Sequence, residues 1–579
     1  MLLQHLCTYA DRQLPLPPPS YQEQPIRYVI DLTGDGRFLG MIDTSDPSAP
    51  KLRRGQRRLA PALVRTSGVR AKLLADKASY ALGFVPPGES PKREGQEHEA
   101  FVALVAACAA ATSDLAVSAV ARFLEALGAA SVPLPADFDP GGTITFRVDG
   151  VFPIDRPDVQ AFWASLQASG DAPVMPCVVC GQERPVLAGH PVPIKPIPNG
   201  QTSGNFLISA NAKAFESYGL ERSLIAPTCA PCAEKYGTAL NALLAGSDSR
   251  LRIGGNVYVF WTAERTGFRP GSLLSDPDPA EVRELLDAAR SGKEAATEID
   301  DVAFYAVGLS ASGARIAVRT WIDTTVGAAR SRLVRYFALQ EIVDAYGEAG
   351  PALPIWRLAG STVRDPRKEE PAPGVADGLF ELALAGRRLP EDVLARAVQR
   401  CRAGQGVSRE RAALIKMALG SEQGWTNERI ETMSGLDAAN RDPAYLCGRL
   451  LAVLDAIQQQ AISPNATVVD RFYGSASSAP ASVFGNLLDN AQNHLAKLRK
   501  EPRTRGAGIA LDGRLMDVMD GLDGFPPTLT LPQQGLFALG FYHQRAADRR
   551  ARRERAEERR SGAESGAAEP DAAESDLDE

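Results

Sequence analysis

Cys177-Val178-Val179-Cys180 and Cys229-Ala230-Pro231-Cys232 are the two segments that decide how the middle of this chain folds. In each, the two intervening residues let both thiols of a tight turn face one ion, and two such turns supply the four sulfur ligands that zinc prefers in closed sites. A shell of four thiolates leaves no coordination position for water or substrate, so we expect a structural zinc. Because 48 residues separate the pairs, two unrelated buried pairs or a redox-active dithiol remain as alternatives.

The composition is typical of a folded protein with several domains. The chain has 579 residues, of which 44% are hydrophobic and 23% charged, which suits roughly two to four domains. The apolar run Phe101–Ala111 is too short to cross a bilayer, and Met1–Gln13 lacks the pattern of a secretion signal. The other cysteines lie in apolar surroundings and are expected to be reduced core thiols: Cys7, Cys108, Cys401 and Cys447. We therefore predict a cytoplasmic protein without membrane contact.

Basic residues are locally concentrated although the net charge is −6. The last 19 residues contain seven acids and no base, and without them the charge would be +1. The stretch from Lys51 to Lys77 is basic and nearly free of acids, and Arg545–Arg560 holds eight arginines against four acids. Such clusters attract phosphate groups. A solvated surface without a partner is the alternative interpretation of each.

Hydrophobic periodicity predicts an α+β multidomain protein, with a mixed α/β N-terminal body followed by an α-helical C-terminal bundle. A hairpin is expected around the turn Gly34-Asp35-Gly36, and a helical pair over 97–127. Further strands are expected at 144–148, 256–262, 301–309 and 314–322, and further helices at 233–244, 279–291, 444–461 and 482–500. The predicted domains are 1–372 (with the zinc-candidate region 173–262), 373–545, and an arginine-rich helix with a disordered acidic tail over 546–579.

Motifs of common enzymes are absent from the sequence. The chain has five histidines, and His98-Glu99 does not complete the H-E-x-x-H pattern because Val102 stands at the second histidine position. Neither a phosphate-binding G-x-x-x-x-G-K-[ST] loop nor a G-x-S-x-G elbow occurs. We therefore expect a protein that is not an enzyme. The alternative is a metal-dependent nuclease whose carboxylates are dispersed in sequence.

Taken in order, several strings resemble the large subunit of the type I-C CRISPR interference complex, called Cascade. They include Tyr28–Asp31, Leu73–Lys77, Cys177–Gly181, Gly204–Ser209, Asp470–Tyr473 and Gln534–Gln544. The resemblance spans nearly the whole chain up to about Arg545. The complete second cysteine pair and the arginine-rich and acidic C-terminus lie outside the pattern.

The resemblance implies a non-catalytic subunit of an RNA-guided antiviral DNA surveillance complex. Such a subunit recognises the protospacer-adjacent motif (PAM) in duplex DNA, aids R-loop formation, holds the displaced strand and recruits a separate helicase-nuclease. The implied partners are double-stranded target DNA, the displaced single strand, guide RNA through the complex, and the Cascade backbone, RNA-processing and small subunits. The C-terminal helices resemble that small subunit.

Motif recognition needs small donors at base edges and cations that fix the protein on phosphates. The loop 198–205 is rich in small polar residues, and we expect Gln201, Ser203 and Asn205 to approach the groove. Residues of the basic stretch are expected to grip the duplex backbone: Arg53, Arg54, Arg57, Arg58 and Lys72. The displaced strand is expected to contact a cluster at the end of a C-terminal helix: Arg499, Lys500, Arg503 and Arg505.

Two further readings of the same features stay open. One is a stand-alone zinc-bearing transcription factor, which is disfavoured because no recognition helix with a basic face lies beside the cysteine pairs. The other is a structural scaffold of the complex that touches protein partners and no DNA. In that case the basic clusters would be solvated surface.

Overall fold

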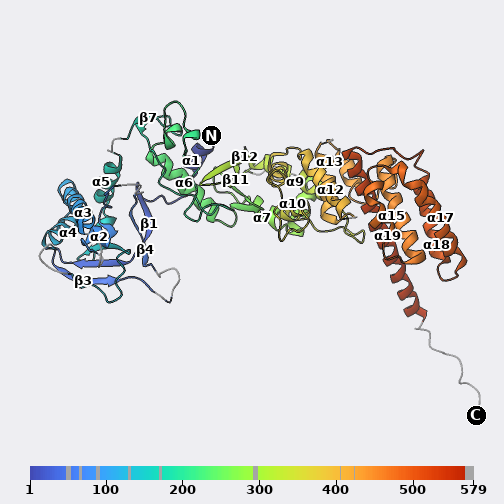
Figure 1. Ribbon diagram of the computed structural model, residues 1–579, viewed down its shortest axis with the longest axis horizontal. Coiled ribbons are helices and arrows are strands. Elements are labelled where there is room, and N and C mark those ends of the chain that lie inside the picture. The colour runs from blue at the N-terminus through green and yellow to red at the C-terminus, as the bar shows by residue number, and fades with distance from the viewer. Residues whose placement is uncertain are drawn as a thin grey trace, which may run out of the picture. The chain divides into compact units, whose positions relative to one another are not determined.

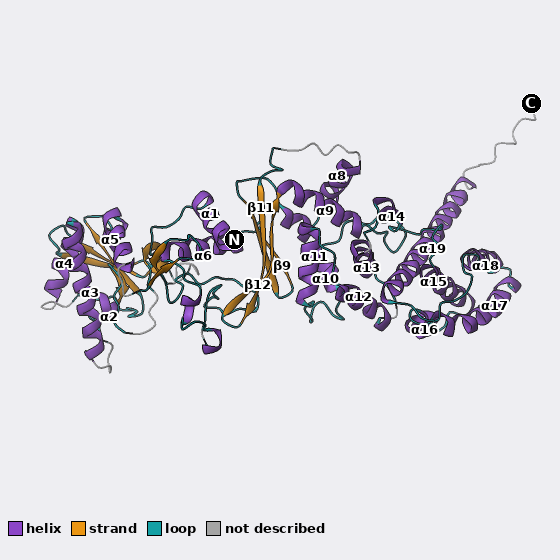
Figure 2. Ribbon diagram, turned by 90° about the horizontal axis from the view of Figure 1, so that it is seen from above, coloured by secondary structure: helices purple, strands orange, loops and turns teal. Residues whose placement is uncertain are grey.

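The fold is described from a computed structural model. It covers residues 1–46, 48, 54–63, 68–85, 91–127, 132–168, 172–210, 212–290, 298–404, 406–422 and 424–566, with the backbone alone at 91–92, 168, 289 and 559–566. The acidic tail predicted to be disordered therefore lies outside the described residues from position 567 onward. The predicted mixture of an α/β N-terminal part and a helical C-terminal part is confirmed (Figure 2).

The chain packs as two compact units. The first comprises residues 1–196, 200–242 and 312–316, and the second comprises 197–199, 243–311 and 317–579. The boundary predicted near residue 372 falls inside the second unit, because the sheet that precedes it shares one hydrophobic core with the C-terminal helices. Each unit is described by itself below.

The first unit is built on a four-stranded sheet with the order β3-β2-β6-β5. Its strands are β2 (Tyr28–Leu32), β3 (Phe38–Asp43), β5 (Ala75–Lys77) and β6 (Thr143–Val148). β2 and β3 form the predicted antiparallel hairpin, whereas β2 and β6 run parallel. Parallel neighbours need a long crossover, which the predicted helical pair supplies: α3 (Pro91–Thr112) and α4 (Leu115–Leu127).

The helical pair α3–α4 lies beside the sheet (Figure 1), and aromatic side chains join the two. Phe101 of α3 and Phe123 of α4 each place their ring centre 6.2 Å from that of Phe146 on β6. All three side chains are buried. Burying such rings contributes several kcal/mol of the stability of this unit.

The remaining elements of the first unit are short. They are α1 (Leu2–Gln13), β1 (Tyr21–Ile26), β4 (Gln56–Pro61), α2 (Ala78–Ala81), η1 (Pro153–Asp155), α5 (Pro157–Ala168), β7 (Val174–Pro176), β8 (Glu183–Pro185), η2 (Lys213–Phe215), η3 (Arg222–Ile225) and the start of α6 (Ala230–Ala245). β1 and β4 pair antiparallel as a separate two-stranded ribbon, and so do β7 and β8. Between β8 and α6 the described residues form only short 3₁₀ turns and isolated bridges.

The second unit begins with a sheet of order β12-β11-β10-β9. Its strands are β9 (Arg250–Ile253), β10 (Asn256–Thr262), β11 (Ala303–Ser312) and β12 (Arg315–Thr325). The strands predicted at 256–262, 301–309 and 314–322 are thus confirmed. Tyr258 of β10 stacks on Phe380, with ring centres 4.2 Å apart, and so joins the sheet to the first helix that follows residue 372.

Helices make up the rest of the second unit. They are α7 (Pro270–Ser275), α8 (Pro279–Arg290), α9 (Val326–Gln340), α10 (Ile355–Gly360), α11 (Pro373–Ala385), α12 (Glu391–Ala403), α13 (Arg409–Glu422), α14 (Asn427–Thr432), α15 (Pro443–Ile462), α16 (Val468–Ala476), η4 (Pro480–Ser482), α17 (Phe484–Lys500), α18 (Arg505–Met519) and α19 (Leu531–Gly566). The predicted arginine-rich helix is the second half of α19 and is continuous with its buried first half.

Two glycines let α15 and α19 touch backbone to backbone. A Cβ atom on Gly448 of α15 would lie 2.0 Å from the carbonyl oxygen of Phe537, and one on Gly540 of α19 would lie 2.1 Å from that of Tyr445. Real Cβ atoms do not approach this closely, so only glycine fits at either position. Beside the crossing, the Arg449 Nε–H donates to Gln544 at 3.0 Å, and the Gln544 amide donates to Asp548 at 3.1 Å. Close packing and a satisfied polar network therefore fix the position of α19.

Replacing Gly540 by alanine should lower the melting temperature of the chain, because the added methyl must force α15 and α19 apart at a cost of roughly 1 to 3 kcal/mol or more. Gly513→Ala is the matched control, since Gly513 lies in the interior of α18 with no atom within 4 Å of the added Cβ. That control should be neutral or stabilising by up to about 1 kcal/mol. Circular dichroism melts of both variants test this, and equal shifts would contradict the proposed crossing.

Candidate functional site

Each cysteine pair lies on a tight turn whose backbone is held by hydrogen bonds. Cys177 and Cys180 lie between β7 and β8, where the Gly181 N–H donates to the Cys177 carbonyl at 2.8 Å and the Cys177 N–H donates to Gln182 at 3.0 Å. Gly181 has φ +73°, a conformation that favours glycine. The second pair lies at the N-terminus of α6, with Cys229 directly before the helix and Cys232 in its first turn.

The four sulfur atoms converge on one point. The Sγ atoms of Cys177, Cys180, Cys229 and Cys232 all lie within 4.8 Å of one another, and those of Cys180 and Cys229 are 3.9 Å apart. A disulfide would bring two sulfurs to about 2.05 Å, whereas a tetrahedral zinc site with Zn–S bonds of about 2.3 Å separates its sulfurs by about 3.8 Å. Among the residues that the structure describes, this is the one group of His, Cys, Asp or Glu placed to hold a metal.

The surroundings of the sulfurs favour a bound cation. Burial alone would raise the pKa of the Cys177 thiol, but N–H groups of the backbone outweigh it and bring that pKa down to about 7. One of these donors is the Cys229 N–H, 3.4 Å from the Cys177 sulfur. Burial raises the pKa of Cys229, so charging all four thiols side by side requires a positive ion between them. The donor set thus fits zinc, with all four tetrahedral positions taken by protein.

The N-terminal helix covers the cysteine cluster. Gln4 of α1 donates its amide to the Val179 carbonyl at 3.0 Å, and the Cys7 thiol lies 3.5 Å from the Cys232 carbonyl. Asp11 of the same helix forms an ion pair of 2.7 Å with Lys235 of α6. The cluster therefore joins three segments that are far apart in sequence, namely α1, the turn between β7 and β8, and the start of α6. This is a structural role.

The purified chain is expected to carry one zinc ion, and Cys180→Ser should remove most of it, because three thiolates hold zinc less tightly than four. Loss of the ion should lower the melting temperature by roughly 5 to 10 °C, since a metal that binds only the folded state stabilises it. Metal analysis and thermal melts measure both effects. Cys7→Ala is the matched control, because Cys7 touches the cluster without being one of the four ligands; zinc loss in this variant would refute the assignment.

The basic side chains of the stretch from Lys51 to Lys77 differ in their exposure and in whether they pair with an acid. Arg53 lies outside the described residues. Arg54 and Arg57 are exposed near and on β4, and Arg57 pairs at 3.4 Å with Glu23 of β1, which is itself exposed. Such a surface pair is worth little and exchanges readily for a phosphate. The exposed side chains of Arg54 and Arg57 could therefore contact the phosphate backbone of a nucleic acid.

Arg58 and Lys72 have partners inside the protein. The Arg58 guanidinium lies 3.6 Å from the ring centre of Phe152 and pairs with Asp155. The Lys72 ammonium donates to the Gln24 side chain at 3.2 Å. These contacts stabilise the β1–β4 ribbon, so both side chains are less free to bind DNA than their neighbours in sequence.

The polar loop presents two of its three predicted residues. Gln201 and Ser203 are exposed on a turn closed by the hydrogen bond from the Gly204 N–H to the Gln201 carbonyl, at 3.0 Å. Gly204 has φ +107°, and a Cβ there would lie 2.6 Å from that of Pro193.

Asn205 is fully buried. Its side-chain oxygen accepts from the Gln201 N–H at 3.0 Å, and its amide donates to the Gly313 carbonyl at 2.8 Å. We therefore correct the expectation for this residue: Asn205 supports the turn, because its polar atoms are already used, and does not face a partner. Sequence alone does not distinguish a buried asparagine from an exposed one in a polar loop.

The predicted C-terminal cluster lies on exposed surface where α17 turns into α18. Lys500, Arg503 and Arg505 form no ion pair with an acid of the described ranges, whereas Arg499 pairs with Asp512 of α18. Lys497 adds a further exposed cation. Burial lowers the pKa of His494, and the charge of Lys497 lowers it further. The result is a positively charged helix end with one of its four predicted residues engaged.

Comparison with known families identifies the chain at the family level. The family described as CRISPR-associated protein (Cas_Csd1) matches residues 4–548, which is nearly the whole sequence. The chain belongs to this family. The match confirms that the chain is a CRISPR-associated protein, as the resemblance implied. It ends within the arginine-rich part of α19, so the last 31 residues lie beyond it.

No curated protein matches the chain in a sequence search. None of the described helices combines the length and the apolar character that a transmembrane segment needs.

Proposed function

We propose that this CRISPR-associated protein is the large subunit of a type I-C Cascade complex and recognises the PAM in duplex DNA. The observation that carries this proposal is the family match over residues 4–548. In such complexes guide RNA reads the long target sequence by base pairing, so protein needs to read only a short motif. The proposed partners are therefore target DNA, guide RNA within the complex, the other Cascade subunits and a helicase-nuclease that performs the cleavage.

The exposed turn of the first unit suits base reading. Gln201 and Ser203 carry small hydrogen-bond donors and acceptors, and the buried Asn205 side chain holds the turn by accepting from the Gln201 N–H. A side chain on a fixed turn loses little entropy when it docks in a groove. We propose Gln201 and Ser203 as the base-edge contacts, and Arg54 and Arg57 as contacts to the phosphates.

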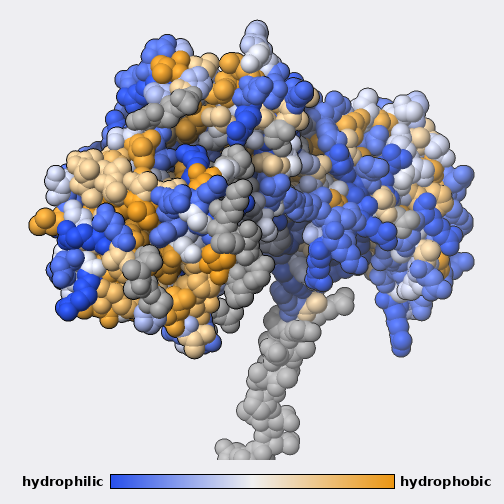
Figure 3. All heavy atoms as spheres, turned by 60° about the vertical axis from the view of Figure 1, so that its left-hand side comes forward, coloured by the Kyte–Doolittle hydropathy of each residue, from blue (hydrophilic) through white to orange (hydrophobic). Residues whose placement is uncertain are grey.

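The surface also offers places for protein partners. Figure 3 shows one face of the molecule on which hydrophobic side chains gather in patches between polar ones. In the first unit, Leu115 is 83% exposed and Leu39 60% exposed. We propose that such exposed apolar side chains contact other subunits of the complex. In this proposal zinc is structural and the subunit itself cleaves no bond.

Joint replacement of Gln201 and Ser203 by alanine should weaken binding of motif-bearing duplex by about 1 to 3 kcal/mol per lost base contact and leave a scrambled duplex unchanged. Arg57→Ala should weaken both duplexes alike and reduce the slope of log K against log salt by about 0.9, because one phosphate contact is lost. Binding is measured with the assembled complex across a salt series.

Arg12→Ala is the control for Arg57→Ala, since Arg12 is exposed in the same unit on α1. It should leave both affinities unchanged. If the unaltered complex binds motif-bearing and scrambled duplex equally well, the reader role is wrong.

We propose further that the positively charged end of α17 holds the displaced strand. Reversing Lys500 and Arg503 to glutamate should lower R-loop yield and reduce the salt slope for single-stranded DNA by at least about 1.4, because two phosphate contacts are lost. The matched control reverses Arg367 and Lys368, an exposed pair of cations elsewhere in the second unit. Equal R-loop yields in the two double variants would count against this role.

A further inference from the structure

The second half of α19 extends beyond the helices on which its first half packs, as Figure 1 and Figure 2 both show. Residues 536–544 are buried, whereas every side chain over 552–558 is exposed. Because α19 is one continuous helix over Leu531–Gly566, its buried half fixes the direction of the exposed half. The exposed side chains therefore stand at the regular spacing of a helix, with a rise of about 1.5 Å per residue.

Acids pair with the arginines on one side of this exposed half. Arg550 pairs with Glu554 at 2.8 Å and with Glu348 at 3.8 Å. Arg553 also pairs with Glu348, and its Nε lies 3.5 Å from a carboxylate oxygen of Glu557. At 3.6 residues per turn, the four helix residues of this network point to the same side of α19. Their charges balance one another.

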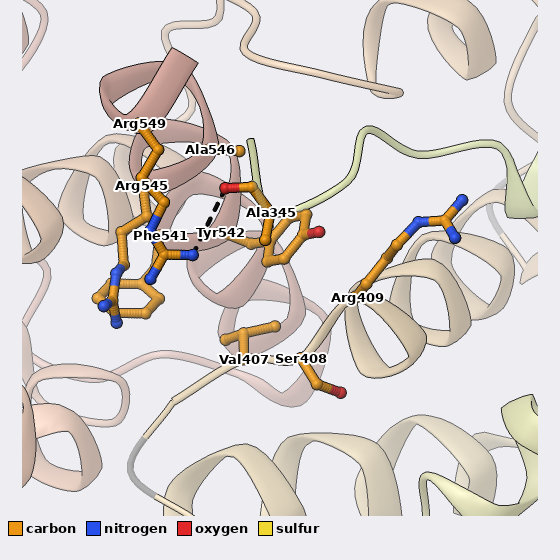
Figure 4. Close-up of a pocket in the computed structure, with 9 residues that line it drawn as sticks. All are labelled: Ala345, Val407, Ser408, Arg409, Phe541, Tyr542, Arg545, Ala546 and Arg549. Carbon is orange, nitrogen blue, oxygen red and sulfur yellow. Dashed lines mark hydrogen bonds between the residues drawn. The ribbon is translucent and has the colours of Figure 1, made fainter. Parts of the chain in front are cut away.

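Three arginines on the opposite side have no such partners. Arg549, Arg552 and Arg555 follow one another at intervals of three residues, and we call them the arginine stripe. In the part of the chain that the structure describes, none of the three forms an ion pair with an acid. Figure 4 shows the contact of Arg549 with the Ala345 carbonyl, a neutral acceptor at 3.4 Å. Glu558 follows Arg555 by three residues without pairing with it.

One acid, Asp548, acts on the arginine stripe from the buried side. Its carboxylate pairs at 3.2 Å with Arg514 of α18. Burial raises the pKa of Asp548, and the charges of Arg514, Arg552 and Arg449 act in the opposite direction. A single carboxylate is thus shared among three guanidinium groups, so it balances only part of the charge of Arg552. The arginine stripe carries more positive charge than this acid compensates.

We propose that the arginine stripe contacts the phosphate backbone of a nucleic acid. A guanidinium group is a planar fork of donors that matches phosphate oxygens, and a row of exposed cations is attracted to the closely spaced charges of such a backbone. The stripe begins directly after residue 548, where the family match ends, so it adds a contact to those proposed for Gln201 and for the end of α17. The choice of nucleic acid over an acidic polypeptide rests on the proposed function.

The test replaces Arg552 and Arg555 together by glutamine in the full-length chain. Fluorescence anisotropy then measures binding of a labelled DNA duplex without the motif, and of a single strand of equal length, across a salt series. Loss of two phosphate contacts should reduce the slope of log K against log salt by about 1.8 for the duplex or by about 1.4 for the single strand. At about 0.1 M salt, the affinity for the DNA form that the stripe binds should fall at least about tenfold.

The matched control replaces Arg550 and Arg553 together by glutamine. It removes the same charge from the same helix, but on the side where the arginines pair with Glu348, Glu554 and Glu557. Exposed pairs contribute little to stability, so this variant should fold, which a circular dichroism melt checks. Its salt slope should differ from that of the unaltered chain by less than about 0.5, because its arginines are already engaged.

The difference between the two double variants decides the proposal. A larger loss for the stripe variant supports it, and the DNA form affected shows whether a duplex or a single strand is bound. The proposal is overturned if both variants lose affinity alike, if the stripe variant binds both DNA forms as the unaltered chain does, or if polyglutamate displaces the labelled DNA as readily as unlabelled DNA does. The proposed function is judged separately, by whether the unaltered complex discriminates motif-bearing from scrambled duplex.

Discussion

The convergence of four cysteine sulfurs is the constraint on which the middle of the first unit depends. Between Pro185 and Ala230 the described backbone forms short 3₁₀ turns and isolated bridges, so few main-chain ladders hold it. A metal ion held by these four sulfurs would supply the cross-link that regular structure does not. α1 packs on this cluster. The segment between the two cysteine pairs carries the exposed turn at Gln201. The exposed turn itself is held by Asn205, which accepts from the Gln201 N–H and donates to the Gly313 carbonyl.

The second unit depends on close helix packing instead. Gly448 and Gly540 allow α15 and α19 to cross with their backbones in contact. This fixes the buried first half of α19, and the arginine-rich second half continues from it as the same helix. Because the helix is anchored, its backbone holds Arg545 and Arg549 at fixed positions.

Pairing within the fold decides which cations remain available. The basic stretch and the C-terminal cluster each look like an unbroken run of cations in the sequence. In the fold, however, Arg58 stacks on Phe152 and pairs with Asp155. Arg499 likewise pairs with Asp512. Arg57, Lys500 and Arg503 stay exposed. A cluster counted along the sequence overstates the charge that a phosphate would meet, since each internal ion pair removes one cation from the surface field.

Sequence patterns alone predicted the hairpin around Gly34–Gly36, the helical pair, the β10–β12 strands and the cysteine cluster, because periodicity and C-x-x-C spacing are local signals. It also led to the family. The folded structure was needed to show that Asn205 is a buried support and that the second sheet shares a core with the C-terminal helices. Those facts depend on which residues distant in sequence come into contact, and no local pattern encodes such contacts.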